Sequence, residues 1–219
     1  MGEIEVLKSE KKVIIHSEIF LYGDSATEKL TKQFGGEIEQ LWNEVDGTIE
    51  LDGDIFNVEF SISSFFSPNL TVEEVMNNTN PRKNYFRVED YSPINISWVD
   101  GIGSNTGYML LGNLYEGSTT ASHEYGHTLG LEHPQDINYI GKGRPGIMYP
   151  RGSLVDPEFQ YDPTKQPGEN GGTIHPMHRR VNQVDIDNLK LPQLIQNNFT
   201  VLGSFTSVFH PKQLKPEVS

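Results

Sequence analysis

The chain has 219 residues and no cysteine, so it forms no disulfide and offers no thiolate to a metal ion. Its 30 acidic and 17 basic residues give a formal net charge of −13, which disfavours binding to the phosphate backbone of a nucleic acid. No apolar run is long enough to span a membrane, and the N-terminal stretch MGEIEVLKSEKKV lacks the apolar segment of a signal peptide.

The length favours a single domain. We expect one domain over residues 1–219, with its core from about residue 11 to residue 195. The tail 196–219 carries no pattern that assigns it to a helix or a strand.

The N-terminal region predicts a strand followed by a helix. Residues 13–22 are rich in β-branched and aromatic side chains, which is typical of a strand. Ser25 and Glu28 have the spacing of a capping box, so we expect a helix from there to about Glu44. The glycine pair Gly35-Gly36 indicates a kink or an early end of this helix.

The next region predicts a hairpin and several short elements. Residues 48–66 form two strand-like runs around Asp52-Gly53, a pair suited to a tight turn. Thr71 and Glu74 have the spacing to cap a short helix. Three further short strands are expected, at 84–90, 94–101 and 107–115.

The C-terminal half predicts two helices separated by a long tract. The first helix is expected from Ser118 or Thr119 to about Leu131. The tract 134–176 is rich in Gly and Pro and too long for an ordinary connection, so we expect it to be functional or held by a metal. Helical spacing returns after Asn182, a suitable N-cap residue.

Three of the seven histidines lie in the stretch ASHEYGHTLGLEHP. Because residues four apart share one face of an α-helix, His123 and His127 present two imidazoles to the same point. Glu124, beside the first of them, can reach a water in the open coordination position of a metal and act as its general base. Gly130 gives the backbone the freedom to end the helix and turn, so that His133 can return as a third ligand.

The alternative is that these histidines bind no metal and are ordinary core residues with hydrogen-bond partners, or surface residues. HExxH alone often arises by chance. The longer pattern HExxHxxGxxH fixes five residues, which random composition would produce on the order of once in ten thousand chains of this size. We therefore interpret the stretch as a metal site.

The stretch HEYGHTLGLEH resembles the zinc-binding motif of the metzincin peptidases. In that family a methionine turn lies beneath the metal, and GIMYP offers Met148 for this role. The segments IMYP and QVDIDNL resemble the matrixins, whereas Pro134 directly after the third histidine resembles the serralysins. The resemblance points to a divergent, bacterial branch, related to metallopeptidase domains of secreted or toxin-associated proteins.

The resemblance implies an α+β fold. Its parts would be a twisted, mostly parallel sheet with an antiparallel edge strand, an active-site helix and a C-terminal helix. We place the edge strand at Asn105–Asn113, where an extended peptide would add as a further strand. The implied substrate-binding residues are Tyr108, Met109, Leu110, Leu111 and Tyr149.

The long tract holds further candidate residues. Three acids in it are candidate calcium ligands, although turn-forming acids need no ion: Asp156, Glu158 and Asp162. His175 and His178, next to Arg179-Arg180, suit a surface turn better than a second metal site, and the resemblance leaves open that they line the primed-side pocket. By resemblance, Asp185 braces the methionine turn from the last helix.

The resemblance implies a single-domain zinc endopeptidase. One catalytic Zn²⁺ would be held by His123, His127 and His133, with Glu124 as general base and Met148 in support. The expected partners are a peptide or protein substrate and, since the chain lacks the propeptide cysteine that restrains matrixins, a protein inhibitor. A secreted or extracellular location follows from the resemblance alone.

The sequence leaves two alternatives to the endopeptidase function. The first is a zinc amidase or deacylase acting on a non-protein amide, which only substrate profiling separates from a peptidase. The second is a zinc-stabilised, toxin-associated binding module without peptidase activity. The presence of Glu124 argues against the second, because pseudoenzymes commonly lose the base.

Overall fold

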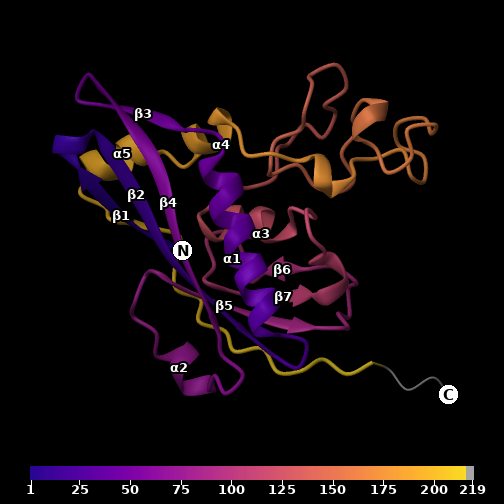
Figure 1. The fold of residues 1–219 in the computed structure, drawn as a ribbon, viewed down its shortest axis with the longest axis horizontal. Helices are drawn as coiled ribbons and strands as arrows, with labels where there is room; N and C mark the ends of the chain where they lie inside the picture. The colour runs from indigo at the N-terminus through magenta and orange to yellow at the C-terminus, as the bar shows by residue number, and fades with distance from the viewer. Residues whose placement is uncertain (216–219) are drawn as a thin grey trace.

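The structure is a computed structural model that describes residues 1–215. Within these residues, eight strands form one sheet, and the helices are few and short apart from α1 (Figure 1). The strands are β1 (Gly2–Leu7), β2 (Lys12–Tyr22), β3 (Thr48–Leu51), β4 (Asp54–Phe66), β5 (Lys83–Glu89), β6 (Trp98–Val99), β7 (Thr106–Leu110) and β8 (Val201–Leu202). The helices are α1 (Glu28–Asn43), α2 (Val72–Met76), α3 (Thr120–Thr128), α4 (Gln183–Asn188) and α5 (Leu191–Gln196).

The sheet has a parallel centre and antiparallel margins. Its main path runs β3-β4-β2-β5-β7-β6. The pairs β4-β2, β2-β5 and β5-β7 are parallel, and the outer pairs β3-β4 and β7-β6 are antiparallel. The first part of β2 also pairs antiparallel with β1, which in turn pairs with β8.

The predicted edge strand is not at the edge. The segment Asn105–Asn113 contains β7 and a 3-10 turn at Leu111–Asn113, and β7 has β5 on one side and β6 on the other. The antiparallel edge is β6, which pairs Trp98 with Tyr108 and Val99 with Gly107. The prediction was wrong because strand order depends on long-range pairing, which the local pattern of a short segment does not contain.

Helix α1 begins two residues later than the capping-box pattern suggests. The hydroxyl of Thr27 caps the helix by accepting a hydrogen bond from the Leu30 N–H, at 3.1 Å. Ser25 is not the cap, because its N–H donates to the carbonyl of Val88 in a turn against β5.

The glycine pair does not break α1, contrary to the sequence-based expectation. A Cβ at Gly35 would lie 2.7 Å from the side chain of Ser64, so this glycine lets the helix approach β4 closely. Gly36 faces open space. The helix therefore continues to Asn43 and covers one face of the sheet (Figure 1).

The hairpin and two capping predictions are confirmed. Asp52 and Gly53 both have positive φ, as the tight turn between β3 and β4 requires. Thr71 forms a capping box with Glu74 at the start of α2. Asn182 caps α4 in the same way, with Asp185 as its partner.

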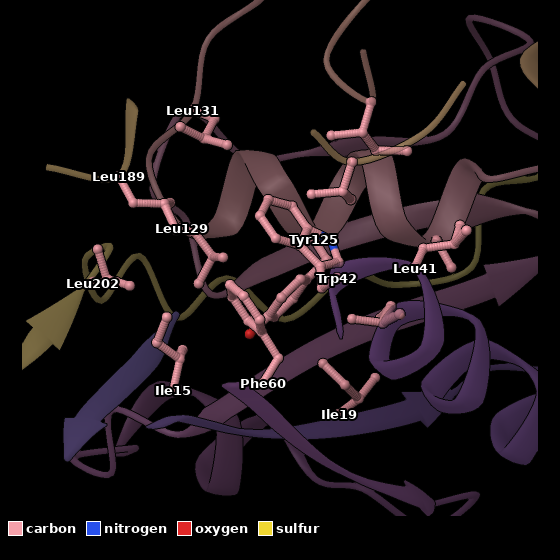
Figure 2. Packing of buried hydrophobic residues seen from close by; sticks show 14 of the residues in the cluster. Ile15, Ile19, Leu41, Trp42, Phe60, Tyr125, Leu129, Leu131, Leu189 and Leu202 are labelled. Atoms are coloured by element: carbon pink, nitrogen blue, oxygen red, sulfur yellow. The ribbon is translucent and has the colours of Figure 1, made fainter. Parts of the chain in front are cut away.

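Helix α3 is fixed to α1 and the sheet by aromatic side chains. The ring of Trp42 lies 4.9 Å from that of Phe60 and 5.7 Å from that of Tyr125, centroid to centroid (Figure 2). The indole N–H of Trp42 donates to the carbonyl of Ser122, and the hydroxyl of Tyr125 bonds that of Ser17 at 2.8 Å. Ring packing and hydrogen bonds together therefore hold α3 in place.

The ordered core extends beyond the expected range 11–195. It includes β1 at the N-terminal side and β8 at the C-terminal side. The segment 203–215 then runs along β7 and the end of β6, while the last four residues of the expected tail, 216–219, lie outside the described residues. Among residues 1–215, no helix is long and apolar enough to cross a membrane.

Candidate metal centre

The HExxH segment forms α3, and all of its residues are buried. The helix ends at Thr128, before the expected Leu131, because Gly130 takes a φ of +102°. The N–H of Leu131 then reaches back to the carbonyl of Gly126, and that of Gly130 to the carbonyl of His127. This is the Schellman arrangement of a glycine-terminated helix. It turns the chain so that the next residues pass back over α3.

This turn brings the three predicted ligands together. The Nε2 atom of His133 lies 3.1 Å from Nε2 of His123 and 3.0 Å from Nε2 of His127. Among residues 1–215, these three form the one group of three His, Asp or Glu side chains with ligand atoms this close together. His123 and His127 are buried, and His133 is exposed.

Hydrogen bonds fix the ring orientation of the two helix histidines. Nδ1 of His123 lies 2.7 Å from the carbonyl oxygen of Ile147, and Nδ1 of His127 lies 2.7 Å from that of Leu131. Because a carbonyl oxygen only accepts, each Nδ1 carries the proton, and each Nε2 presents a lone pair. Two lone pairs therefore face Nε2 of His133, and a hydrogen on that atom would satisfy only one of them.

A metal ion fits this donor set. Zinc–nitrogen bonds of about 2.0–2.1 Å at a tetrahedral ion place two ligand nitrogens roughly 3.3 Å apart. The observed Nε2 separations of 3.0 and 3.1 Å are close to that value. Burial lowers the pKa of all three histidines, that of His127 to about 4, which favours the neutral form that binds metal.

The turn that carries Met148 packs against the face of α3 at Gly126. A Cβ at Gly126 would overlap the sulfur of Met148, which is 4% exposed. The preceding Ile147 supplies the carbonyl that orients His123. Asp185 lies at the same turn, where the N–H groups of Asn182 and Ile147 oppose the rise of its pKa to about 6 that burial causes. The roles that the resemblance implies for Met148 and Asp185 stay predictions.

Glu124 is 7% exposed and lines the same cleft as the three histidines. Burial raises the pKa of its carboxyl group to about 8, although the positive charges of Arg179 and Arg151 oppose the rise. Burial in the cleft therefore shifts the pKa of this carboxyl group upward, toward neutral pH.

The cleft has a volume of about 420 Å³. The apolar part of its lining, called the apolar wall below, comes mainly from β6 and residues beside it in sequence: Ile96, Trp98, Val99 and Ile102, with Pro150. The polar part, called the polar wall below, consists of Asn113, Thr120, Arg151 and Arg179. Periodicity and motif gave no signal for either wall, because chain segments distant in sequence build them.

Arg179 is buried, contrary to the expectation from the sequence. The sequence placed Arg179-Arg180 on a surface turn, but Arg179 is 3% exposed. Its Nε donates to the hydroxyl of Thr119 at 3.0 Å, and its Nη1 donates to the carbonyl of Tyr149 at 3.2 Å. Thr119 itself has a φ of +57°, an unfavourable conformation for a β-branched residue, and its hydroxyl also donates to the carbonyl of Pro176. Arg179 is therefore part of the structure that starts α3.

The five residues expected to contact substrate lie outside the cleft lining. Tyr108 and Met109 are fully buried, and Leu111 is exposed. Leu110 and Tyr149 are partly buried. The strand that lines the cleft is β6.

The candidate calcium ligands do not converge on a common point within residues 1–215. Asp156 accepts hydrogen bonds from the N–H of Gly141, and Asp162 accepts from Thr164. These acids stabilise turns, so the structure does not support the calcium site. His175 and His178 pack against aromatic rings, at 4.4 Å from Tyr161 and 5.7 Å from Phe159 respectively.

No protein-family model matches the chain, and no curated protein matches it. Among solved structures, a crystal structure of an archaemetzincin from Methanopyrus kandleri is similar, with 12% sequence identity and a TM-score of 0.40. The match covers 81% of this chain and 96% of that chain. A TM-score this low does not establish a shared fold, so the family and its matrixin-like or serralysin-like subtype stay predictions from the motif.

Proposed function

We propose that this protein is a zinc-dependent endopeptidase. The observation that carries the proposal is the convergence of three Nε2 atoms, two of them with a fixed lone pair, in a cleft that also contains a buried glutamate. Three neutral imidazoles leave one position of a tetrahedral zinc ion open, which is the arrangement of catalytic rather than structural zinc sites.

The side chains of the cleft have separable roles in this proposal. Bound zinc supplies a Lewis acid and lowers the pKa of water, which is the chemistry that amide hydrolysis needs. The Glu124 carboxylate takes a proton from the attacking water and returns it to the leaving amine nitrogen. The carbonyls of Ile147 and Leu131 hold His123 and His127 in their ligating orientation.

The experiment is a comparison of wild type with Glu124→Gln. Metal content is measured by elemental analysis of protein purified without added metal, and cleavage is assayed with a peptide library. We expect about one zinc per chain in both proteins, because Glu124 is not a ligand. Turnover should fall by about 10²–10⁴-fold in the variant, the typical contribution of a general acid–base.

The matched control is Glu132→Gln, which changes an exposed glutamate of the same motif that does not line the cleft. It should retain both zinc and cleavage. Near-wild-type turnover in Glu124→Gln would rule out its role as the base. One zinc per chain without cleavage of any peptide would instead favour a hydrolase of non-protein amides or a binding module.

A further inference from the structure

The cleft carries positive charge in a strongly acidic protein. The chain has a formal net charge of −13, yet the two charged side chains on the polar wall of the cleft, apart from Glu124, are arginines. Within residues 1–215, neither Arg151 nor Arg179 lies within 4.0 Å of a carboxylate oxygen. Both guanidinium groups therefore line the cleft without an ion-pair partner from the described part of the chain.

Arg179 is held rigidly but incompletely bonded. Its Nε and Nη1 donate to Thr119 and Tyr149, whereas Nη2 makes no hydrogen bond with residues 1–215. Burial of an unpaired guanidinium is unfavourable, and it lowers the pKa of Arg179 to about 10. Arg179 lines the same cleft as Glu124 and His123.

Other polar atoms of the polar wall also lack a hydrogen-bond partner among residues 1–215. Arg151 donates to the side-chain carbonyl of Asn113 at 2.8 Å, which leaves its other guanidinium nitrogens without a hydrogen bond to residues 1–215. The hydroxyl of Thr120 is buried without a partner in the described chain and lines the cleft. Polar groups in such positions are normally satisfied in the functional state. Together, the two arginines and this hydroxyl give the polar wall a surplus of hydrogen-bond donors, which suits an anion.

We propose that Arg179 and Arg151 bind a carboxylate of the substrate close to the scissile amide, so that the enzyme acts on peptides with an acidic group at that position. This inference rests on the proposed peptidase function. A planar guanidinium matches a carboxylate in geometry as well as charge, through two parallel hydrogen bonds. The apolar wall with Trp98 and Val99 would receive uncharged side chains of the same peptide.

A peptide can supply this carboxylate from two sources. One is its C-terminal carboxylate, in which case cleavage occurs close to the end of the chain. The other is the side chain of an Asp or Glu next to the scissile bond, in which case cleavage occurs internally. Both use the same recognition chemistry, and the substrates below distinguish them.

The test uses a matched set of N-acetylated hexapeptides. The base peptide has no acidic side chain and ends in an amide; a second has a free C-terminal carboxylate; a third series is amidated with one Glu, or Gln as its control, at each position in turn. In wild type, kcat/KM for one carboxylate-bearing class should exceed that for the matched amide or Gln peptide by about tenfold to a hundredfold, the range for a hydrogen bond to a charged group.

Variants connect this preference to the arginines. Arg151→Gln should reduce the preference at least tenfold, and Arg179→Lys should reduce it because lysine lacks the planar fork. Arg180→Gln is the matched control, since Arg180 adjoins Arg179 but does not line the cleft. It should keep the preference. If Arg179→Lys does not fold, Arg151→Gln, whose side chain is only partly buried, still decides the question.

A binding measurement separates this inference from the peptidase proposal. The same peptides are titrated into zinc-loaded Glu124→Gln, and binding is followed by calorimetry. Tighter binding of carboxylate peptides, lost in Arg151→Gln, supports the inference even if no peptide is cleaved. Cleavage or binding that is equal for carboxylate and neutral peptides would overturn the inference while leaving the peptidase intact.

Discussion

At Glu37, on the side of α1 that meets α3, one carboxylate oxygen is buried without a hydrogen-bond partner in the described chain. Burial raises the pKa of this carboxyl group from 4.5 to about 7, although the N–H groups of Ser122 and Ala121 oppose the rise. A carboxyl group with a raised pKa in the folded state binds its proton more tightly there than in the unfolded state. Its contribution to the free energy of unfolding therefore falls as the pH rises from 4.5 to about 7.

The Glu37→Gln variant should remove this pH dependence. The free energy of unfolding of wild type should fall, relative to the variant, by on the order of 1–2 kcal/mol between pH 4.5 and 7.5, with allowance for the partial exposure of the side chain. Urea unfolding of both zinc-saturated proteins at these two pH values measures the difference. Parallel pH profiles for the two proteins would contradict the raised pKa.

Some residues of the candidate site can be predicted from the sequence, and others cannot. His123, Glu124 and His127 lie on one short helix, and Gly130 and His133 follow at fixed offsets, so local geometry places all of them. Arg179 lies far along the chain and reaches the cleft only because the tract after α3 folds back to Thr119. No local pattern encodes that return, which is why the sequence suggested a surface position instead.

Between elements, the contact of α3 with the turn that carries Met148 depends on a glycine. Gly126 lies on α3, between His123 and His127, and the sulfur of Met148 and the ring of Trp42 occupy the space that a side chain there would need. The turn that carries Met148 also provides the carbonyl that orients His123. Displacement of this turn would therefore disturb both the core and the orientation of His123.

Gly126→Ala should destabilise the protein, although alanine is the better helix former. Alanine favours a helix by about 1 kcal/mol over glycine, but the added Cβ would overlap Met148, and overpacking typically costs about 1–3 kcal/mol. Combined with Met148→Ala, the overlap is relieved, so the double variant should be more stable than the sum of the two single effects predicts, by about 1 kcal/mol or more. Urea unfolding of the four proteins gives this coupling.

Gly36→Ala is the matched control for this prediction. It makes the same substitution in α1 at a position that faces open space. It should raise the free energy of unfolding by up to about 1 kcal/mol. An equal gain in Gly126→Ala would show that Met148 does not pack there.

Elements with strong local signals were predictable, and their arrangement was not. The β2 strand, the Asp52-Gly53 hairpin and the caps at Thr71 and Asn182 follow from residue type and spacing. The continuity of α1 through Gly35 depends on its contact with Ser64 of β4, and the position of β6 outside β7 depends on pairing across the sheet. Both are tertiary effects, which override local propensity.

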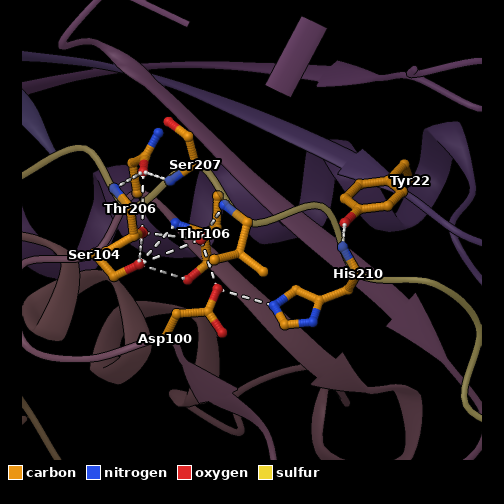
Figure 3. Close-up of polar contacts among 9 residues, drawn as sticks. Tyr22, Asp100, Ser104, Thr106, Thr206, Ser207 and His210 are labelled. Atoms are coloured by element: carbon orange, nitrogen blue, oxygen red, sulfur yellow. Dashed lines mark hydrogen bonds and ion pairs between the residues drawn. The ribbon is translucent and has the colours of Figure 1, made fainter. Parts of the chain in front are cut away.

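Across the whole molecule, the segment 203–215 contacts residues on or beside three strands of the sheet: β2, β6 and β7. The amides of Thr206 and Ser207 donate to the side chain of Asn105, and the amide of His210 donates to the hydroxyl of Tyr22 on β2 (Figure 3). The ring of His210 reaches Asp100, directly after β6, at 2.9 Å. Because β6 contributes Trp98 and Val99 to the cleft lining, this segment stabilises an element of the cleft.

His210→Ala should loosen β6 without affecting the metal site. The variant loses the bond to Asp100 and the edge-on packing of the imidazole against Trp98 and Tyr108. The free energy of unfolding should fall by about 1–2 kcal/mol, zinc content should stay at the wild-type level, and KM for a peptide substrate should rise because Trp98 lines the cleft. Hydrogen exchange of the peptide that spans residues 96–102 should be faster than in wild type.

Lys212→Ala, in the same segment, removes only an exposed ion pair with Asp24 and should change stability by less than about 1 kcal/mol. Unchanged exchange at β6 in His210→Ala would mean that the pairing with β7 alone holds this wall, and that the C-terminal segment stabilises the sheet independently of the cleft.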